Sequence, residues 1–325
     1  MEKFIENGIL VYGPRKAGTT LLQNLLDGSK SIMMVPDELK LKFMVDNILK
    51  TNHDKKRFYF ANGRSSFRNS LSVNEMGGKF DIKLKDQFRL GNISDKDLDD
   101  KFDTARYIYG LNNIANDPKI LNLRDIYANN ILEFKKSLRD NWDYKYWASK
   151  EVGGNPEIII THFKSVFARS KFIFIARDPK IVVRSIILKR RSRGIILSIR
   201  SIIGECYKTE RIINYFASIK ASSDKILIFY EDLVRDTHKE MKKITEFLQV
   251  PYDRIFEKPS LFGINVKVRT SSRKTKTVFQ EKKDWKKDLT YREKLAVILF
   301  NFFYQLFREM LGHKVVTYQK LRRIV

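Results

Sequence analysis

Three short apolar runs, each followed by a polar turn and a segment of helical periodicity, constrain the fold of this 325-residue chain. They are Ile9–Tyr12, Lys171–Ala176 and Lys225–Tyr230. Apolar strands that alternate with helices predict an α/β fold of three layers, in which helices cover both faces of a central, mostly parallel sheet. Ligands bind such sheets at the carboxyl ends of the strands, where the sequences GPRKAGTT, RDP and YED fall.

The domain organisation follows from the absence of a linker, repeat or low-complexity segment along the sequence. We predict one domain over residues 1–325, with 37–143 as a more polar, mainly helical insertion that forms a lid or a binding region. Within it, helices are predicted around Asp95–Phe102 and Leu123–Leu138, and MGGKF is predicted to be a loop.

The composition limits the partners and the compartment. Lys and Arg number 63 against 38 Asp and Glu, a net charge of +25 that attracts polyanions such as nucleic acid, acidic lipid, anionic glycans or phosphorylated cofactors. Cys206 is the single cysteine, so no intrachain disulfide is possible, and the N-terminus lacks the pattern of a secretory signal. We expect a cytoplasmic protein.

The apolar segment Leu295–Phe307 is the longest in the sequence. At 13 residues it is too short to span a bilayer, and we expect it to pack in the core, with contact to a membrane surface as the alternative. The basic run Lys189–Arg193 has no accompanying nucleic-acid module, so no nucleic acid is expected. The histidines do not cluster with cysteine, so no metal site is predicted.

The loop GPRKAGTT carries the first chemical signal. Gly13 and Gly18 have the spacing of the ATP-binding P-loop, but Thr19 stands where that motif has its lysine. A glycine-rich turn between a strand and a helix directs backbone N–H groups and the helix dipole at one point, which makes an anion site wherever the lysine lies. Lys16, inside the loop, is placed to reach the far side of a bound phosphate.

This loop resembles the 5′-phosphosulfate loop of sulfotransferases that use 3′-phosphoadenosine 5′-phosphosulfate (PAPS), whose pattern is K-x-G-T-T after the first strand. The preceding Gly13-Pro14 makes it most similar to the glycan-type and bacterial branches. The resemblance implies a P-loop-like fold and a role for the whole loop in donor binding. The loop residues concerned are Arg15, Lys16, Ala17, Gly18, Thr19 and Thr20.

Two further segments carry the same resemblance. Arg177 ends a strand and Ser185 follows eight positions later, which is the family's 3′-phosphate motif; an arginine fork and a hydroxyl can grip a phosphate monoester. The segment from Ile226 to Asp253 resembles the family's Y-E-D-L strand and helix, in which the tyrosine, here Tyr230, approaches the adenine. The alternative interpretation of the YED sequence is that it carries the metal-binding acid of a kinase.

A late basic segment is similar to the family's second contact with the 3′-phosphate. Arg273 and Lys274 occupy the R-K pair and Trp285 the tryptophan, although Thr275 replaces the usual glycine. Residues 37–143 match no motif, and in this family acceptor specificity usually lies in such a region.

The catalytic base is left between two residues. Sulfuryl transfer needs in-line attack by an acceptor, a base for its proton and positive charge on the departing phosphate, and it demands no metal. Lys16 is expected at the leaving oxygen. Glu151, in YWASKEVGG, is preferred as the base, although Ser149 stands where the family has its acid; His162 is the second candidate.

We therefore predict a PAPS-dependent sulfotransferase (EC 2.8.2 class). Its acceptor would be a hydroxyl or amine on a glycan, a glycolipid or a small molecule. The alternatives are an ATP-dependent P-loop kinase that needs magnesium, and a non-enzymatic basic protein that binds RNA or a membrane.

Overall fold

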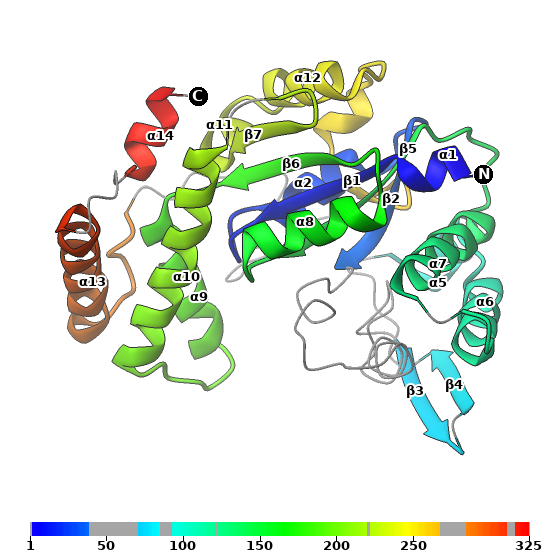
Figure 1. Ribbon diagram of the computed structural model, residues 1–325, viewed down its shortest axis with the longest axis horizontal. Helices are drawn as coiled ribbons and strands as arrows, with labels where there is room; N and C mark the ends of the chain where they lie inside the picture. The colour runs from blue at the N-terminus through cyan, green and yellow to red at the C-terminus, as the bar shows by residue number, and fades with distance from the viewer. Residues whose placement is uncertain are drawn as a thin grey trace.

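A five-stranded parallel sheet forms the centre of the computed structural model (Figure 1). Its strand order is β2-β5-β1-β6-β7. The strands are β1 (Gly8–Gly13), β2 (Ile32–Glu38), β5 (Tyr146–Val152), β6 (Lys171–Ala176) and β7 (Lys225–Phe229). The structure describes residues 2–38, 71–77, 79–84, 93–120, 122–219, 222–266, 284–310 and 316–324.

Strand β1 lies in the middle of the sheet, buried along its whole length between β5 and β6. Because side chains alternate along a strand, its apolar residues divide between the two faces. Ile9 and Val11 pack in one core cluster, and Leu10 and Tyr12 pack in the other. The predicted α/β fold, with helices on both faces, is confirmed.

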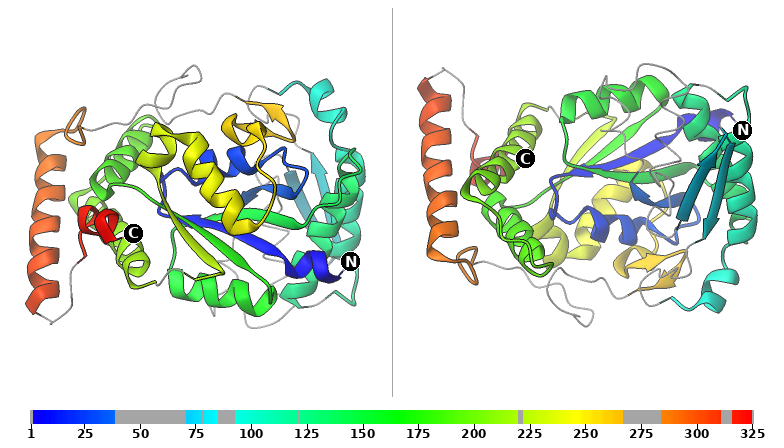
Figure 2. Two further views of the ribbon diagram at one scale, coloured as in Figure 1. Left: turned by 90° about the horizontal axis from the view of Figure 1, so that it is seen from above. Right: turned by 90° about the horizontal axis from the view of Figure 1, so that it is seen from below.

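Helices α2 (Thr19–Leu26) and α12 (Thr237–Leu248) contribute to the first of these clusters, while α8 (Pro156–Val166) and α10 (Ile199–Ser218) contribute to the second. Figure 2 shows this arrangement from above and from below the view of Figure 1. The helical patterns predicted after the first, second and third strands are confirmed as α2, as α9 (Pro179–Arg191) and as α12.

Helix α9 starts where the sequence RDP predicts. The side chain of Asp178 accepts hydrogen bonds from the backbone N–H groups of Lys180 at 2.8 Å and Ile181 at 3.4 Å, and Pro179 occupies the first turn. This is the favoured chemistry of a helix N-terminus. Helix α9 therefore leaves the carboxyl end of β6 in a fixed direction.

The insertion contains the two predicted helices, α5 (Asp95–Asp99) and α7 (Leu123–Ser137), together with two elements that the periodicity did not reveal. These are a hairpin of β3 (Leu71–Met76) and β4 (Lys79–Leu84), and helix α6 (Thr104–Asn116). The predicted MGGKF loop therefore includes the end of β3 and the start of β4, with Gly77 at the turn.

The hairpin is held by side chains that a local pattern cannot predict. Asn112 and Asn116 of α6 each bond both backbone groups of one β4 residue, Ile82 and Phe80 respectively, at 2.8–2.9 Å. The two amides satisfy the edge of β4 as a neighbouring strand would, so the hairpin depends on a contact distant in sequence.

The remaining elements lie at the two ends of the chain and after α12. They are α1 (Glu2–Glu6), α11 (Tyr230–Arg235), η1 (Arg254–Glu257), β8 (Ser260–Leu261), β9 (Ile264–Asn265), α13 (Tyr291–Met310) and α14 (Tyr318–Ile324). None of the described helices combines the length and continuous hydropathy that crossing a bilayer requires.

Candidate functional site

The loop between β1 and α2 is shaped by its two glycines. A Cβ atom at Gly13 would lie 2.5 Å from the carbonyl oxygen of Ile175, and one at Gly18 would lie 2.4 Å from Cδ2 of Tyr230. Gly18 also has a φ of +110°, which disfavours any residue with a side chain. The loop can therefore lie against the carboxyl ends of β6 and β7 only because these two positions lack a Cβ.

Helix α2 begins at this loop with its N-terminal amides open to a ligand. Gly18 is the N-cap and supplies no side-chain hydrogen bond, and the first turn contains no acidic residue. The first backbone N–H groups of a helix have no partner within the helix, and they carry the positive end of its dipole. This helix start fits a phosphate group.

Arg177 joins the loop to the next two strands. Its Nη1 donates a hydrogen bond of 3.0 Å to the carbonyl oxygen of Lys16, and its guanidinium lies 4.0 Å from the centre of the Tyr230 ring. Since Tyr230 directly follows β7, three strand ends meet here. The structure thus brings together Lys16, Arg177 and Tyr230, although Lys16 and Tyr230 are 214 positions apart in the sequence.

Ser185 belongs to the same surface of α9 as two residues that contact the loop. Val182 and Ile186 form a buried cluster with Ala17, and Ser185 lies between them on this helix face. Its hydroxyl donates to the carbonyl oxygen of Ile181 at 2.8 Å, which leaves the oxygen lone pairs facing outward from that bond. Ser185 is therefore on the side of α9 that adjoins the loop, and Arg177, which precedes α9, contacts the loop directly.

Lys150 is a site residue that the sequence prediction did not include. Its ammonium group donates a 2.8 Å hydrogen bond to Oγ1 of Thr20, in the first turn of α2. The pairing of β5 with β1, which sets Val11 beside Lys150, brings it there. A lysine at the end of an apolar strand, in YWASK, was the available signal.

The loop collects positive charge. The pKa of Lys16 is lowered by burial first, and then by the nearby charges of Lys189, Arg193 and Lys150. In the part of the chain that the structure describes, no carboxylate forms an ion pair with Lys16. A set of like charges at the start of a helix is stabilised by an anion, so the site suits a ligand with more than one phosphate or sulfate.

The two acidic side chains of the YED sequence bind other residues of the protein. Glu231 is buried; its Oε1 accepts from the N–H of Asp178 at 3.3 Å, and its Oε2 accepts from the hydroxyl of Tyr318. Asp232 pairs with Arg322. Glu231 therefore fixes the turn that carries Arg177 instead of facing a metal, which argues against the kinase alternative.

Residues 154–254 match the model of a sulfotransferase family. The matched segment contains α8, β6, α9, α10, β7 and α12, and hence Arg177, Ser185 and Tyr230. Over these residues the chain is similar to the sulfotransferase family. The first loop lies outside the matched segment, so its assignment depends on the contacts described above.

Solved structures of sulfotransferases resemble this chain over most of its length. The sulfotransferase domain of the Synechococcus PCC 7002 olefin synthase is 18% identical with a TM-score of 0.54, covering 92% of this chain and 94% of that domain. The sulfotransferase domain from the curacin biosynthetic pathway is 16% identical with a TM-score of 0.46, covering 95% and 98%. The first likeness establishes a shared fold. No curated protein sequence matches this chain.

The two candidate bases, Glu151 and His162, lie on β5 and α8 respectively. Glu151 ends β5 beside Tyr12, with its side chain completely buried, and strand alternation places it on the sheet face opposite Lys150. Burial raises the pKa of Tyr12, and the charge of Glu151 raises it further. His162 lies in α8, six residues after Pro156 and so about 9 Å along the helix from its start. The role of base stays a prediction for each.

The remaining predicted donor contacts are only partly described. Arg15 is exposed on the loop, whereas Arg273 and Lys274 lie outside the described residues. Trp285 packs beside α9, with Nζ of Lys180 5.7 Å from its ring centre. Among the residues that the structure describes, no group of three His, Cys, Asp or Glu side chains suits a metal ion.

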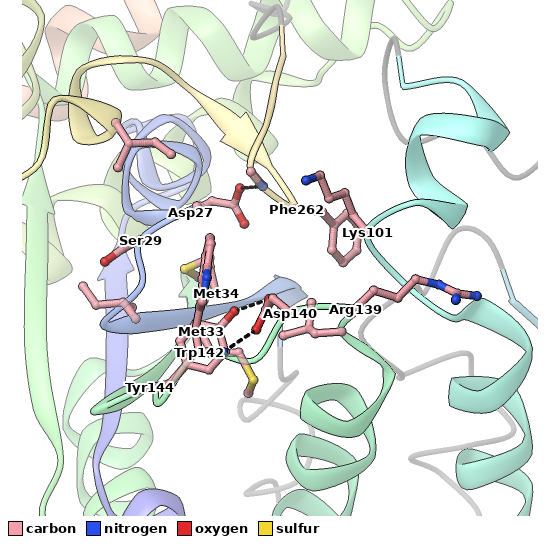
Figure 3. A pocket seen from close by; sticks show the side chains of 15 residues that line it. Asp27, Ser29, Met33, Met34, Lys101, Arg139, Asp140, Trp142, Tyr144 and Phe262 are labelled. Carbon is pink, nitrogen blue, oxygen red and sulfur yellow. Dashed lines mark hydrogen bonds between the residues drawn. The ribbon is translucent and has the colours of Figure 1, made fainter.

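A cavity of about 130 Å³ lies at the far end of α2, roughly 12 Å from the loop (Figure 3). Asp27 is fully buried beside it and accepts hydrogen bonds from Ser260 at 2.7 Å and from the N–H of Gly263 at 2.8 Å. Its carboxylate thereby fixes the β8–β9 turn to α2. The cavity belongs to the packing of the sheet's other end and is separate from the donor loop.

Proposed function

We propose that this sulfotransferase transfers a sulfuryl group from PAPS to a hydroxyl or amine of a glycan, glycolipid or small molecule. Adenosine 3′,5′-bisphosphate would be the released product. The observation that carries the proposal is the junction of Arg177 with the Lys16 carbonyl and the Tyr230 ring, in the loop that leads into α2. This junction would bring the positions for two phosphate groups and for the adenine of PAPS together in one site.

The chain's residues fit this donor at both of its ends. The backbone amides from Lys16 to Thr20, together with the dipole of α2, would hold the 5′-phosphosulfate. Arg177 and Ser185, on the adjoining strand end and helix, would hold the 3′-phosphate, while Tyr230 contacts the adenine. ATP has no 3′-phosphate, so the second position favours the bisphosphate nucleotide.

The protein's expected contribution to the reaction is positive charge at the loop, beside the leaving group. PAPS, when bound, supplies an activated sulfuryl group on a phosphate leaving group. The Lys16 ammonium is placed to stabilise the negative charge that develops on the departing oxygen, and Lys150 orients the Thr20 hydroxyl through their 2.8 Å hydrogen bond. Glu151 is proposed to accept the proton of the acceptor; His162 is the alternative.

Nucleotide selectivity tests the proposal. We would titrate the protein with adenosine 3′,5′-bisphosphate, adenosine 5′-phosphate and Mg·ATP, following heat of binding and thermal stability. The bisphosphate should bind at least ~30-fold more tightly than the monophosphate, because it alone gains the charge-assisted bonds at Arg177. Arg177→Ala should remove most of this ratio, and Arg106→Ala, an exposed arginine on α6, should leave it unchanged.

Each rival gives a different result. Preferential stabilisation by Mg·ATP would replace the proposal with a kinase, and binding of RNA without any nucleotide would replace it with a binding protein. Equal affinity for the bisphosphate and the monophosphate would remove the 3′-phosphate role of Arg177. A panel of sugars, lipids and phenols with labelled donor would then identify the acceptor.

A further inference from the structure

Helix α13 presents a wide apolar face to the outside of the molecule. It lies at the edge of the molecule in both views of Figure 2, and it packs on α10 through its opposite side. Phe302 is 62% exposed and Met310 is 75% exposed. The outward apolar residues are Leu295, Ile298, Leu299, Phe302, Phe303, Leu306, Phe307 and Met310.

The apolar residues of α13 lie on two sides of the helix, one packed against the protein and one exposed. The inward positions Ala296, Val297 and Phe300 pack against α9 and α10, while the outward residues recur at intervals of three and four. The sequence from Leu295 to Phe307 contains no charged residue. Packing against the rest of the protein therefore does not explain the outward residues.

The apolar surface continues onto α10 and the turn before it. Ile196 is 87% exposed, and Ile199, Ile203 and Tyr207 follow at four-residue intervals along α10. The ring of Tyr207 lies 6.2 Å from that of Tyr304 on α13, which joins the two helices' surfaces. We call the outward residues of α13 together with Ile195, Ile196, Ile199, Ile203 and Tyr207 the apolar surface.

Positive charge gathers at one end of this surface, where α10 and α13 begin, while Glu205 and Glu309 lie further along the two helices. The segment from Pro179 to Gly204, which leads into it, contains no acidic residue. Arg193 and Arg200 are exposed within that segment, and Arg292 is exposed at the start of α13. An ion pair of 2.5 Å between Arg191 and Glu293 keeps the end of α9 beside the start of α13.

We propose that the apolar surface binds the face of an anionic lipid membrane. Exposed phenylalanine, leucine and isoleucine side chains insert at the boundary of head groups and acyl chains, and the arginines contact lipid phosphates, as in amphipathic helices that lie in the plane of a membrane. No described helix is suited to span the bilayer, so the contact is peripheral.

The charges favour a membrane over a second copy of this chain. Pairing two apolar surfaces would bring together two copies of a protein whose net charge is already +25 and whose exposed arginines border that surface at one end. Like charges facing each other oppose such a dimer, whereas an anionic bilayer complements them. The apolar surface also starts close to the donor loop, because Arg193, two residues before Ile195, is one of the charges that lower the pKa of Lys16.

Co-sedimentation with lipid vesicles tests this proposal. Vesicles of phosphatidylcholine alone would be compared with vesicles that also contain phosphatidylglycerol, at low and at high salt. We expect binding to the anionic vesicles that weakens as salt rises, since only its electrostatic part is screened. The variant Phe302→Ser/Phe303→Ser/Phe307→Ser should lower the partition coefficient at least ~tenfold.

A matched control removes equally exposed apolar side chains elsewhere. Met76→Ser/Tyr109→Ser/Ile158→Ser should leave vesicle binding unchanged, and far-UV circular dichroism should show that both triple variants are folded. Arg200→Gln/Arg292→Gln should weaken binding at low salt and reduce its salt dependence.

Three results would overturn the proposal. They are failure of the unaltered protein to bind anionic vesicles, equal binding by the two triple variants, and light scattering that shows a dimer which the phenylalanine variant alone dissociates. Bisphosphate titration of the phenylalanine variant keeps the outcome separate from the proposed function, because the donor site contains none of the altered residues.

Discussion

Gly18→Ala tests the close contact between the donor loop and Tyr230. The new Cβ would lie 2.4 Å from Cδ2 of Tyr230, at a backbone φ of +110°. A side chain at positive φ costs about 1–2 kcal/mol, and forcing an extra carbon into a packed site costs about 1–3 kcal/mol. Together these predict a loss of about 2–5 kcal/mol in the free energy of unfolding.

Ligand binding should fall with stability, because relief of the clash moves Tyr230 away from Arg177, whose guanidinium is 4.0 Å from the ring centre. We expect the melting temperature to drop by about 3–7 °C and the affinity for adenosine 3′,5′-bisphosphate to fall at least ~tenfold. Thermal unfolding by circular dichroism and titration calorimetry measure the two effects.

Gly77→Ala is the matched control for backbone strain. Gly77 has a φ of +59°, and a Cβ there would have no atom within 4 Å, so only the strain cost applies. If Gly18→Ala were no less stable than Gly77→Ala and bound the bisphosphate normally, the packing of Tyr230 over the loop would be refuted. Adding Tyr230→Ala to Gly18→Ala should make the two effects non-additive, since the ring is then absent.

Three other predictions concern the chemistry and pH dependence. Lys16→Ala should lower kcat by about 100-fold or more while changing bisphosphate affinity far less; unchanged turnover would exclude its leaving-group role. Glu151→Gln should lower kcat by about 100-fold, and a larger loss with His162→Gln would transfer the role of base to His162. Burial raises the pKa of Glu210 from 4.5 to about 7, so the folded state favours the protonated form. The free energy of unfolding should therefore fall by up to about 3 kcal/mol as pH rises from 4.5 to 7. Glu210→Gln should make the melting temperature less dependent on pH in that range. An unchanged pH dependence in this variant would show that Glu210 titrates normally.

Much of the sheet could be predicted from the sequence because each core strand carries its own signal. The runs at Ile9–Tyr12 and Lys171–Ala176 are continuous and apolar, since β1 and β6 are buried on both faces. The strand order was not predictable, because it depends on which strands pair, and β5 lies between β1 and β2 although more than a hundred residues separate it from either.

The site was predictable where a residue's role depends on local geometry. The glycines of GPRKAGTT and the Asp178-Pro179 start of α9 are required by turns and caps, which are properties of short segments. Lys150 was missed as a contact because its position beside Thr20 results from the pairing of β5 with β1. The opposite directions of Lys150 and Glu151, by contrast, follow from the alternation of side chains along β5.

The sequence alone determined that three apolar runs become strands followed by helices, and that the GPRKAGTT loop can bind an anion, because backbone conformation and periodicity act over a few residues. Only the tertiary structure decided that Arg177 bonds the Lys16 carbonyl and stacks on Tyr230, and that the YED acid supports a turn instead of facing a ligand. It also decided that α13, apolar on nearly every side, turns most of its apolar residues outward. Hydropathy records how apolar a residue is, whereas its surroundings depend on how distant segments pack.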